Sequence, residues 1–220
     1  SGWEMVTLDI RELLRDKGIV GAGGGGFPTY AKLQQQGIDY YIANGAECEP
    51  LLDVSKEIMA RFPDKVLKGL NHLKEYTGAK KAVVALKRKY KNAIKSLKEY
   101  RESSKLDVEL FEMEDFFPAG DEHVTVYEVT GRVVPEGGIP LAVGAIVNNI
   151  ETLYNVCLAI EEGLPVTDKF ITVGGDVPNP ITLRVPVGTQ IGWLLSFLGI
   201  DYKDKVIIDG GPMMGNIVSP

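Results

Sequence analysis

The chain has 220 residues, enough for one large or two smaller domains, and 45% hydrophobic with 25% charged residues is ordinary for a globular protein. No apolar run approaches the roughly 20 residues of a membrane span, and residues 1–20 lack the basic start and apolar centre of a signal peptide. Two cysteines, Cys48 and Cys157, provide neither a disulfide framework nor a CxxC metal site. We therefore expect a cytoplasmic protein without a structural metal.

A glycine-rich stretch follows the first predicted helix. The apolar spacing predicts this helix from Leu8 to Lys17, with Gly18 ending it. Gly21-Ala22-Gly23-Gly24-Gly25-Gly26-Phe27-Pro28-Thr29 comes next. Glycines let main-chain N–H groups approach an anionic or planar ligand closely. A flexible linker is the alternative, but linkers are padded with Ser and polar residues, and Phe-Pro-Thr does not fit one. The stretch predicts a phosphate-bearing cofactor.

A polar loop follows the first predicted strand. A short helix is expected over Thr29–Gln36 and a buried strand over Tyr40–Ala43, which runs into Asn44-Gly45-Ala46-Glu47-Cys48-Glu49-Pro50. Open α/β sheets bind ligands at the carboxyl ends of their strands. The two acids beside Cys48 disfavour its thiolate, which argues against a nucleophile.

Helices and strands alternate from there to about residue 163, which indicates an α/β fold. Polar residues mark two later junctions: Gly120-Asp121-Glu122 before an apolar-periodic stretch to Thr130, and Asn148-Asn149 after a strand. The expected helices are Ser55–Phe62, Asp64–Thr77, Lys89–Ser103 and about 151–162, and the expected strands are Ala82–Leu86, Asp107–Met113 and Val143–Val147.

Basic residues concentrate within this region. The net charge is −6, yet residues 80–105 carry ten Lys or Arg against two Glu. Such a segment could bind nucleic acid, but Tyr90, Ala93, Ile94 and Leu97 have the spacing of a buried helical stripe, and no recognition motif accompanies them. A solvated helix face is the favoured interpretation.

The pattern changes after residue 163. Short strands are expected over Phe170–Val173, Ile181–Val187 and Val206–Asp209, with one helix over Ile191–Leu198. This composition predicts a small β-rich module behind the α/β domain.

The polar segments at the element junctions suit one ligand, a flavin nucleotide. Asn side chains carry both a donor and an acceptor and can bind the edge of a flat heterocycle, while loop N–H groups and Lys32 could meet a phosphate. Carboxylates suit ribityl or ribose hydroxyls. Taken singly, each segment is more often an ordinary turn.

A Rossmann-type NAD-binding dehydrogenase is the main alternative. Gly21-x-Gly23-x-x-Gly26 fits its fingerprint, and Glu47 stands 21 residues after Gly26. A helix precedes these glycines, however, where the Rossmann motif requires a strand. A Walker A site is excluded because no Lys-Ser or Lys-Thr follows the loop.

Four motifs, in order, resemble the NADH-binding 51 kDa subunit of respiratory complex I and its relatives of the RnfC and PduS (cobalamin reductase) type. GAGGGGFPTYAK, from Gly21 to Lys32, resembles the family's flavin loop. The other three are Tyr41 to Pro50, similar to the acidic loop, Phe117 to Glu122, similar to the Gly-acid-acid segment, and Val147 to Leu153, similar to the Asn-Asn-x-Glu-Thr signature.

The later part of the chain extends the resemblance. Phe170 to Gly210 looks like the small, ubiquitin-like β-grasp module called SLBB, and Gly210-Gly211-Pro212-Met213-Met214-Gly215 is closer to RnfC and PduS than to complex I. The resemblance implies an FMN-binding α/β domain over residues 3–163 and an SLBB-like domain over residues 164–220.

The resemblance also implies ligands. NADH would pass a hydride to non-covalently bound FMN, and single electrons would go on to iron–sulfur clusters; no side chain need act as a catalytic acid or base. NADH would meet Phe27, Glu49, Phe117, Asp121 and Glu122. The implied FMN contacts are Gly21, Gly23, Gly24, Gly26, Lys32, Asn44, Glu47, Asn148, Asn149 and Thr152.

Departures from the family pattern qualify these expectations. Ala46 stands where complex I members carry Asp, and Asp121 replaces a Glu. The chain has no CxxCxxC, so we expect a fragment of an NADH:acceptor oxidoreductase whose clusters belong to a missing C-terminal domain or a partner subunit, soluble or peripheral to a larger complex. A non-catalytic docking scaffold with a vestigial flavin site is a further alternative.

Overall fold

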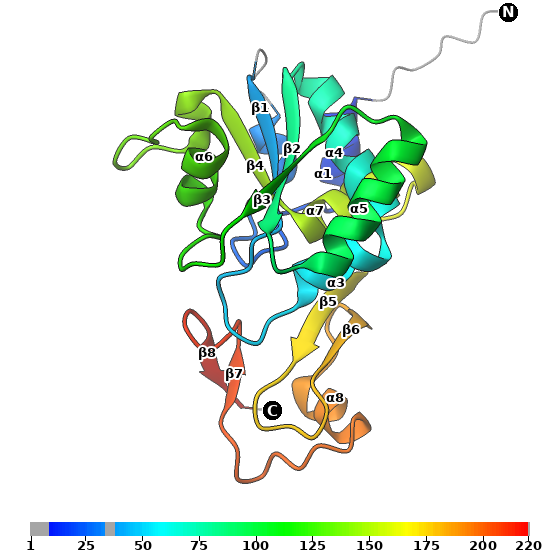
Figure 1. The fold of residues 1–220 in the computed structure, drawn as a ribbon. Coiled ribbons are helices and arrows are strands. Elements are labelled where there is room, and N and C mark those ends of the chain that lie inside the picture. The colour runs from blue at the N-terminus through cyan, green and yellow to red at the C-terminus, as the bar shows by residue number, and fades with distance from the viewer. Residues whose placement is uncertain (1–8, 34–37, 220) are drawn as a thin grey trace, which may run out of the picture.

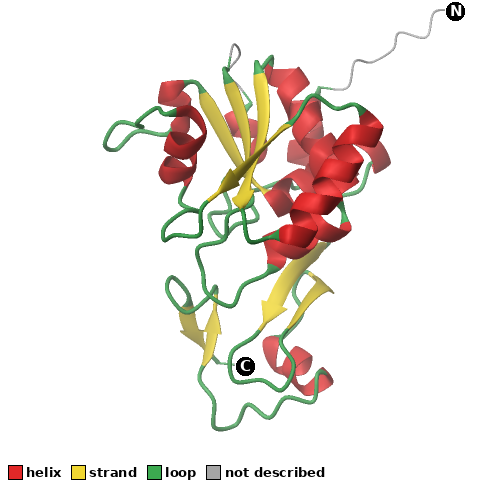
Figure 2. Ribbon diagram, viewed as in Figure 1, coloured by secondary structure: helices red, strands yellow, loops and turns green. Residues whose placement is uncertain are grey.

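A four-stranded parallel sheet lies at the centre of the larger part of the molecule (Figures 1 and 2). The computed structural model describes residues 9–33 and 38–219. The strand order is β3-β2-β1-β4, with β1 at the turning point of the chain's path through the sheet. The strands are β1 (Tyr40–Asn44), β2 (Lys81–Lys87), β3 (Glu109–Met113) and β4 (Ala145–Asn149).

Helices cover both faces of this sheet (Figure 1). One face packs in the larger core against α1, α3, α4, α5 and α7, whereas α6 packs on the other. Side chains alternate between faces along a strand, so Tyr41 and Ala43 enter the larger core and Ile42 the smaller. The helices are α1 (Ile10–Asp16), α2 (Thr29–Lys32), α3 (Val54–Arg61), α4 (Pro63–Thr77), α5 (Lys91–Ser104), α6 (Glu122–Thr130) and α7 (Ile150–Glu162).

The α/β alternation predicted from the sequence is confirmed, with shifted boundaries. The strand expected over Val143–Val147 begins at Ala145, because Val143 ends a 3-10 turn (Pro140–Val143). Asn148 and Asn149, expected in a loop, are instead the last two residues of this strand, β4. Two predicted boundaries, Leu8 and Gln36, lie outside the described residues.

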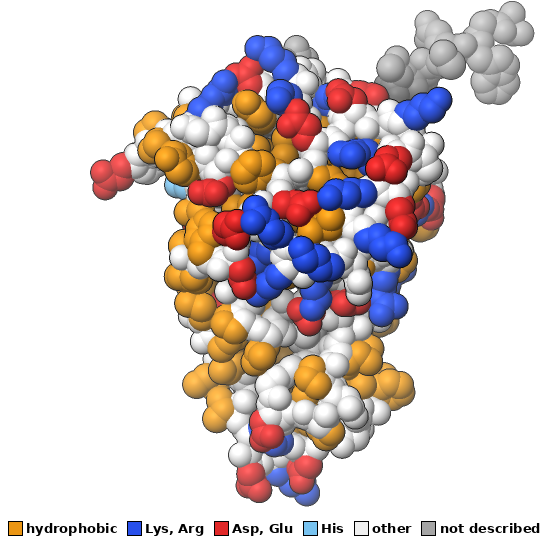
Figure 3. All heavy atoms as spheres, viewed as in Figure 1, with side chains coloured by type: hydrophobic (Ala, Val, Ile, Leu, Met, Phe, Trp, Pro, Cys, Tyr) orange, Lys and Arg blue, Asp and Glu red, His pale blue; other side chains and the backbone are white. Residues whose placement is uncertain are grey.

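The basic segment forms the predicted helix with a buried stripe. Ala93 and Leu97 of α5 are fully buried, and outward lysines pair with acids: Lys89 Nζ lies 2.7 Å from Asp115, and Lys98 Nζ lies 2.7 Å from Glu112. Figure 3 shows the mixed basic and acidic surface over this region. The stripe predicted from the apolar spacing is confirmed.

Residues after α7 form a smaller unit below the sheet (Figure 1). Two antiparallel hairpins flank one helix: β5 (Asp168–Val173) with β6 (Ile181–Pro186), α8 (Ile191–Phe197), and β7 (Ile207–Asp209) with β8 (Asn216–Val218). The element order suits a β-grasp module, but in the described chain the hairpins form two separate two-stranded sheets. Strand β8 was not predicted from the sequence.

An aromatic cluster and a buried acid fix β5 to the α/β domain. The ring of Phe170 lies 6.0 Å from Phe62 and 5.3 Å from Tyr154. Glu151, 2% exposed, accepts a hydrogen bond of 2.9 Å from Phe170 N and pairs with Lys169. Within the described ranges, no helix is both long and apolar enough to cross a membrane.

Candidate functional site

The strand order creates a topological switch point between β1 and β4, and we call the space outside the carboxyl ends of these two strands the crevice. From β1 the chain continues to β2 and β3 on one side, and β4 is added on the other side of β1. Ligands of open α/β sheets bind outside the carboxyl ends of strands at such a switch point. The register pairs Asn44, the last residue of β1, with Asn149, the last residue of β4. The strands that carry the second and the fourth motif therefore end side by side.

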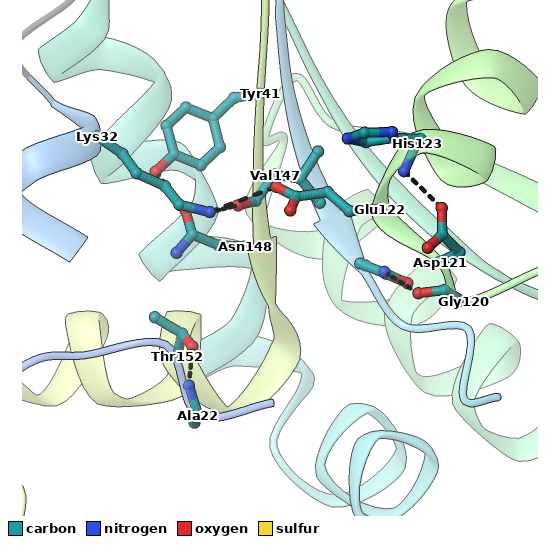
Figure 4. A network of polar contacts seen from close by, with 11 residues as sticks. Ala22, Lys32, Tyr41, Gly120, Asp121, Glu122, His123, Val147, Asn148 and Thr152 are labelled. Carbon is teal, nitrogen blue, oxygen red and sulfur yellow. Dashed lines mark hydrogen bonds and ion pairs between the residues drawn. The ribbon is translucent and has the colours of Figure 1, made fainter. Parts of the chain in front are cut away.

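The glycine loop lies against the start of α7. A hydrogen bond of 2.8 Å from Gly21 N to Phe27 O closes the loop, and Ala22 N donates to Thr152 Oγ1 over 2.9 Å (Figure 4). A Cβ on Gly23 would lie only 3.2 Å from Asn149 Nδ2. The first and last motifs thus meet directly, although they are far apart in the sequence.

The loop presents unused donors to open space. In the described chain, the N–H groups of Gly23, Gly24 and Gly25 donate to no protein acceptor. A Cβ built on Gly24, Gly25 or Gly26 would meet no atom within 4 Å. Consecutive N–H groups of a loop that lies beside the N-terminus of the 13-residue helix α7 form a favourable environment for an anion.

Asn148 is oriented by a buried tyrosine. Tyr41 donates its hydroxyl to Asn148 Oδ1 over 2.8 Å, and burial raises the pKa of Tyr41 so that it stays a donor. Asn148 Nδ2 makes no hydrogen bond to a described residue and points away from Tyr41 (Figure 4). Tyr41 was not predicted as a site residue. A hydroxyl among the buried residues of β1 could have indicated that it has a polar partner.

Asn44 connects two motifs to each other. Its Nδ2 donates to Gly120 O over 2.8 Å, and its Oδ1 accepts from Ala46 N over 3.1 Å. The amide predicted to contact FMN is therefore engaged in joining the acidic loop to the Gly120 segment.

Lys32 lies near the side chains expected around NADH. Its Nζ donates to Val147 O over 2.8 Å and lies 3.4 Å from Glu122 Oε1 (Figure 4). The ring centroid of Phe27 lies 5.9 Å from the same Nζ. We expected Lys32 to meet a phosphate. Within the protein, the carbonyl of Val147 in β4 and the carboxylate of Glu122 hold it, and the contact with a phosphate stays a prediction.

Burial shapes the chemistry of the acidic loop. Glu47 Oε1 accepts from Cys48 N over 3.0 Å and from Glu49 N over 3.1 Å, and burial raises the pKa of Glu47. The pKa of Cys48 is also raised, mainly by burial and further by the charge of Glu47. The direction agrees with the disfavoured thiolate expected from the sequence, but burial, and not the two neighbouring acids, is its main cause.

The residues predicted for NADH differ in their exposure and in the contacts they make within the protein. Phe27 and Phe117 are exposed, at 52% and 64%. Asp121 caps α6 by accepting from His123 N over 2.9 Å. The carboxylate of Glu49 is bound by the backbone of Met213 and Met214 in the smaller unit.

The Rossmann alternative fails on topology. The glycine loop follows α1, and Val20, which precedes it, forms only an isolated bridge to Pro28. The first strand of the sheet comes after the loop. A Rossmann fingerprint requires the strand before the glycines.

A second cleft of about 470 Å³ lies on the β2 side of the acidic loop. Lys87 and Lys89 line it, and both pair with Asp115. Lys56, which also lines it, pairs with Asp53 at 2.7 Å. Its lysines are thus already neutralised within the protein.

The chain is similar in sequence to a known family and to proteins with named redox activities. Residues 14–158 match the Complex1_51K family, described as the Nuo51 FMN-binding domain. The chain is 41% identical over 211 residues to cobalamin reductase PduS of Citrobacter freundii, covering 96% of this chain and 46% of that protein. It is 36% identical over 217 residues to a component of the proton-translocating ferredoxin:NAD(+) oxidoreductase complex of Clostridium ljungdahlii, covering 96% and 47%. The chain thus spans about half the length of these relatives.

A solved structure shares the fold. An NAD+-reducing [NiFe]-hydrogenase in the H2-reduced state matches with a TM-score of 0.77 at 23% identity, covering 91% of this chain and 40% of that one. This coverage extends beyond residue 163, so part of the smaller unit shares the arrangement. The family match, residues 14–158, includes the glycine loop and the strands β1 and β4. The chain therefore belongs to the Complex1_51K family, that of the Nuo51 FMN-binding domain.

Proposed function

We propose that this chain binds FMN in the crevice between β1 and β4, oxidises NADH and passes the electrons to an iron–sulfur acceptor. The observation that carries the proposal is the meeting of four distant motifs at one sheet edge, where free N–H groups face open space. The named activities of the relatives, a cobalamin reductase and a component of a ferredoxin:NAD(+) oxidoreductase, are redox reactions and agree with it.

The phosphate end of FMN would lie on the glycine loop. Gly23 and Gly24 would donate backbone N–H groups, and Asn149 and Thr152 fix the loop to α7. The positive end of the helix dipole favours an anion there. Glu151 does not oppose it, because its charge is paired with Lys169 on the side of the smaller unit.

The ring end would lie nearer Asn148 and Lys32. Asn148 Nδ2 has no hydrogen-bond partner among the described residues and would donate to the ring, and the Lys32 ammonium would stabilise the extra negative charge of the reduced cofactor. Glu47 would contribute an acceptor, and Asn44 would act by holding the acidic loop in place.

Bound FMN supplies a two-electron hydride acceptor that can release electrons singly. The protein's own residues have to align two ring systems and keep water away from them. Phe27 and Phe117 provide exposed aromatic surface for NADH, and Glu122 provides an acceptor for its hydroxyls. No side chain has to transfer a proton in this scheme.

We further propose that residues 164–220 form a separate β-grasp-like domain behind an α/β domain of residues 3–163. The β-β-α-β-β order of the smaller unit supports this division. The acceptor clusters would belong to another part of a longer chain or to a partner subunit, since relatives are about twice as long.

Titration with FMN, followed by anaerobic mixing with NADH, tests the proposal. We expect quenching of flavin fluorescence with one FMN bound per chain, and then bleaching of the flavin's visible absorption by NADH. A chain that takes up no FMN would contradict the proposal and favour the non-catalytic scaffold. FMN uptake without bleaching would leave a flavin site that does not use NADH.

Asn148→Asp gives a sharper test of the site. The carboxylate can still accept from Tyr41, but the free donor is lost and a negative charge is added, so FMN affinity should fall at least about tenfold, roughly 1.4 kcal/mol. Asn92→Asp makes the same charge change on an exposed residue of α5 and should leave affinity unchanged. Equal affinities for both variants would place FMN elsewhere.

A further inference from the structure

Glu49 is clasped by a turn 164 residues further along the chain. Its Oε2 accepts from Met213 N over 2.9 Å, and its Oε1 accepts from Met214 N over 2.6 Å. A Cβ on Gly211 would lie 2.5 Å from Oε2 and 2.7 Å from Cδ of Glu49. The turn therefore encloses the carboxylate, and both oxygens are occupied by backbone donors.

The Gly210–Gly215 turn fits the carboxylate because of its glycine at position 211. Gly211 has a φ of +97°, which L side chains rarely adopt, and no Cβ could be placed between the turn and Glu49. Successive N–H groups that converge on one carboxylate form an anion nest, and hydrogen bonds to a charged acceptor are among the stronger ones. The contact is thus specific to this pair of segments.

Little else holds this turn to the α/β domain. β7 and β8 pair with each other, and neither packs extensively on another helix or strand. The flanking side chains are open to solvent, with Met214 84% exposed and Ile217 78% exposed. In Figure 1 the β7–β8 hairpin stands apart from the helices of the α/β domain.

The other end of the smaller unit is firmly attached. β5 is anchored by the hydrogen bond from Phe170 N to the buried Glu151 and by ring contacts with Phe62 and Tyr154. The smaller unit therefore has one fixed end and one end held mainly at Glu49. Such an arrangement can open at the weaker end without detaching.

We propose that the Gly210–Gly215 turn is an autoinhibitory latch that competes with the pyridine nucleotide for the carboxylate of Glu49. The inference rests on the proposed oxidation of NADH and on the expectation, from the family resemblance, that NADH meets Glu49. While the turn is docked, nucleotide hydroxyls cannot reach Glu49, so only the released form is competent. The apparent nucleotide affinity is then lowered by the fraction of released molecules.

Gly211→Ala tests the latch in the full, FMN-loaded chain. The new methyl group would collide with Glu49, and either the carboxylate or the turn must move, which breaks both hydrogen bonds. Calorimetric titration with NAD+, which cannot reduce FMN, should show binding at least about threefold tighter than in the unaltered protein. FMN affinity should not change.

Gly188→Ala is the matched control. Gly188 lies in the same unit with a φ of +90°, and its Cβ would meet no atom within 4 Å. It carries the same backbone strain without touching the latch, so its NAD+ affinity should equal that of the unaltered protein. A gain in both variants would attribute the effect to general loosening and overturn the latch.

Amide hydrogen exchange provides a second readout. Saturating NAD+ should speed exchange at the amides of Met213 and Met214, because their acceptor is taken by the nucleotide, and should leave Phe170 unchanged. Slower or unaltered exchange at the two methionines would overturn the latch. The latch would also be overturned if Gly211→Ala bound NAD+ as tightly as the unaltered protein, or more weakly. The proposed function would stand in that case.

Failure of the proposed function would look different. If neither the unaltered protein nor Gly211→Ala bound NAD+ after FMN loading, both NADH oxidation and the latch would be rejected. The FMN titration would still decide independently whether the crevice holds a flavin.

Discussion

Ala22 and Thr152 are 130 residues apart in the sequence and are joined by a hydrogen bond of 2.9 Å from the Ala22 N–H to the Thr152 hydroxyl. Thr152 is fully buried in the first turn of α7, so this bond, together with the packing of Gly23 on Asn149, fixes the glycine loop to the helix that begins at the end of β4. The loop's free donors keep their direction because of this attachment.

Replacing Thr152 with valine should therefore impair both stability and cofactor binding. Valine matches threonine in shape but cannot accept the Ala22 N–H, and the loss of the partner of this part-buried donor costs about 1–2 kcal/mol. We expect the free energy of unfolding, measured with urea, to fall by about 1–2 kcal/mol and FMN affinity to fall about tenfold.

Thr77→Val is the matched control for that substitution. Thr77 is equally buried, and its hydroxyl donates to Leu73 O within α4, far from the crevice. This variant should keep full FMN affinity. If Thr152→Val also kept it, the glycine loop would not depend on α7 for its position.

Tyr41→Phe should weaken FMN binding through Asn148. The buried hydroxyl of Tyr41 donates to Asn148 Oδ1 over 2.8 Å and so determines which end of the amide faces the crevice. Without it the amide can rotate, and we expect a loss of about 1 kcal/mol in stability and a several-fold weaker FMN complex.

Tyr76→Phe provides the comparison for Tyr41→Phe. Tyr76 donates to Asp9 on the surface of the protein, so its loss should affect neither quantity strongly. Fluorescence titration and urea denaturation measure both effects. An unchanged FMN affinity in Tyr41→Phe would mean that packing alone orients Asn148.

Periodicity and turn chemistry were sufficient to predict the α/β alternation and the meeting of the motifs. Asn44 and Asn149 end parallel strands, and the carboxyl ends of parallel strands share one edge of a sheet, so their proximity follows from strand order. Glycines that precede a helix suggest an anion site whatever the strand order.

The partners of individual side chains could not be predicted in this way. Glu49 and Asp121 have the character of ligand acids, yet the first binds the backbone of a distant turn and the second caps its own helix. Asn44 and Lys32 likewise bind backbone carbonyls contributed by other elements. Such contacts depend on tertiary packing, which local spacing does not encode.

Gly69 permits the close packing of α4 on α7, and Gly69→Ala should destabilise the fold. A Cβ at this position would lie 2.0 Å from the backbone oxygen of Leu153. Because α7 carries Thr152 and follows Asn149, pushing the helices apart also disturbs the crevice. We expect a loss of about 3 kcal/mol or more, measured by urea denaturation.

Asn71→Ala, on the exposed side of the same helix, provides the control for Gly69→Ala. It removes only a hydrogen bond with Glu75 and should cost less than about 1 kcal/mol. Equal losses for the two variants would show that α4 and α7 can move apart at little cost.

Stability should fall in alkaline solution, partly because of Cys157. Burial in α7 raises the pKa of this thiol to about 12 from its ordinary value of 9.0. Between these values the unfolded chain loses a proton that the folded chain keeps, so the free energy of unfolding decreases as the pH rises. Below about pH 9 both states are protonated and the thiol has no effect.

Cys157→Ala isolates this contribution. The variant loses some packing at neutral pH, but its stability should decline less steeply between about pH 9 and pH 11 than that of the unaltered protein. Part of the decline will remain, because burial also raises the pKa of Tyr90 to about 12. Urea denaturation across this range measures both slopes. Parallel curves would mean that the Cys157 thiol ionises as readily in the folded chain as in the unfolded one.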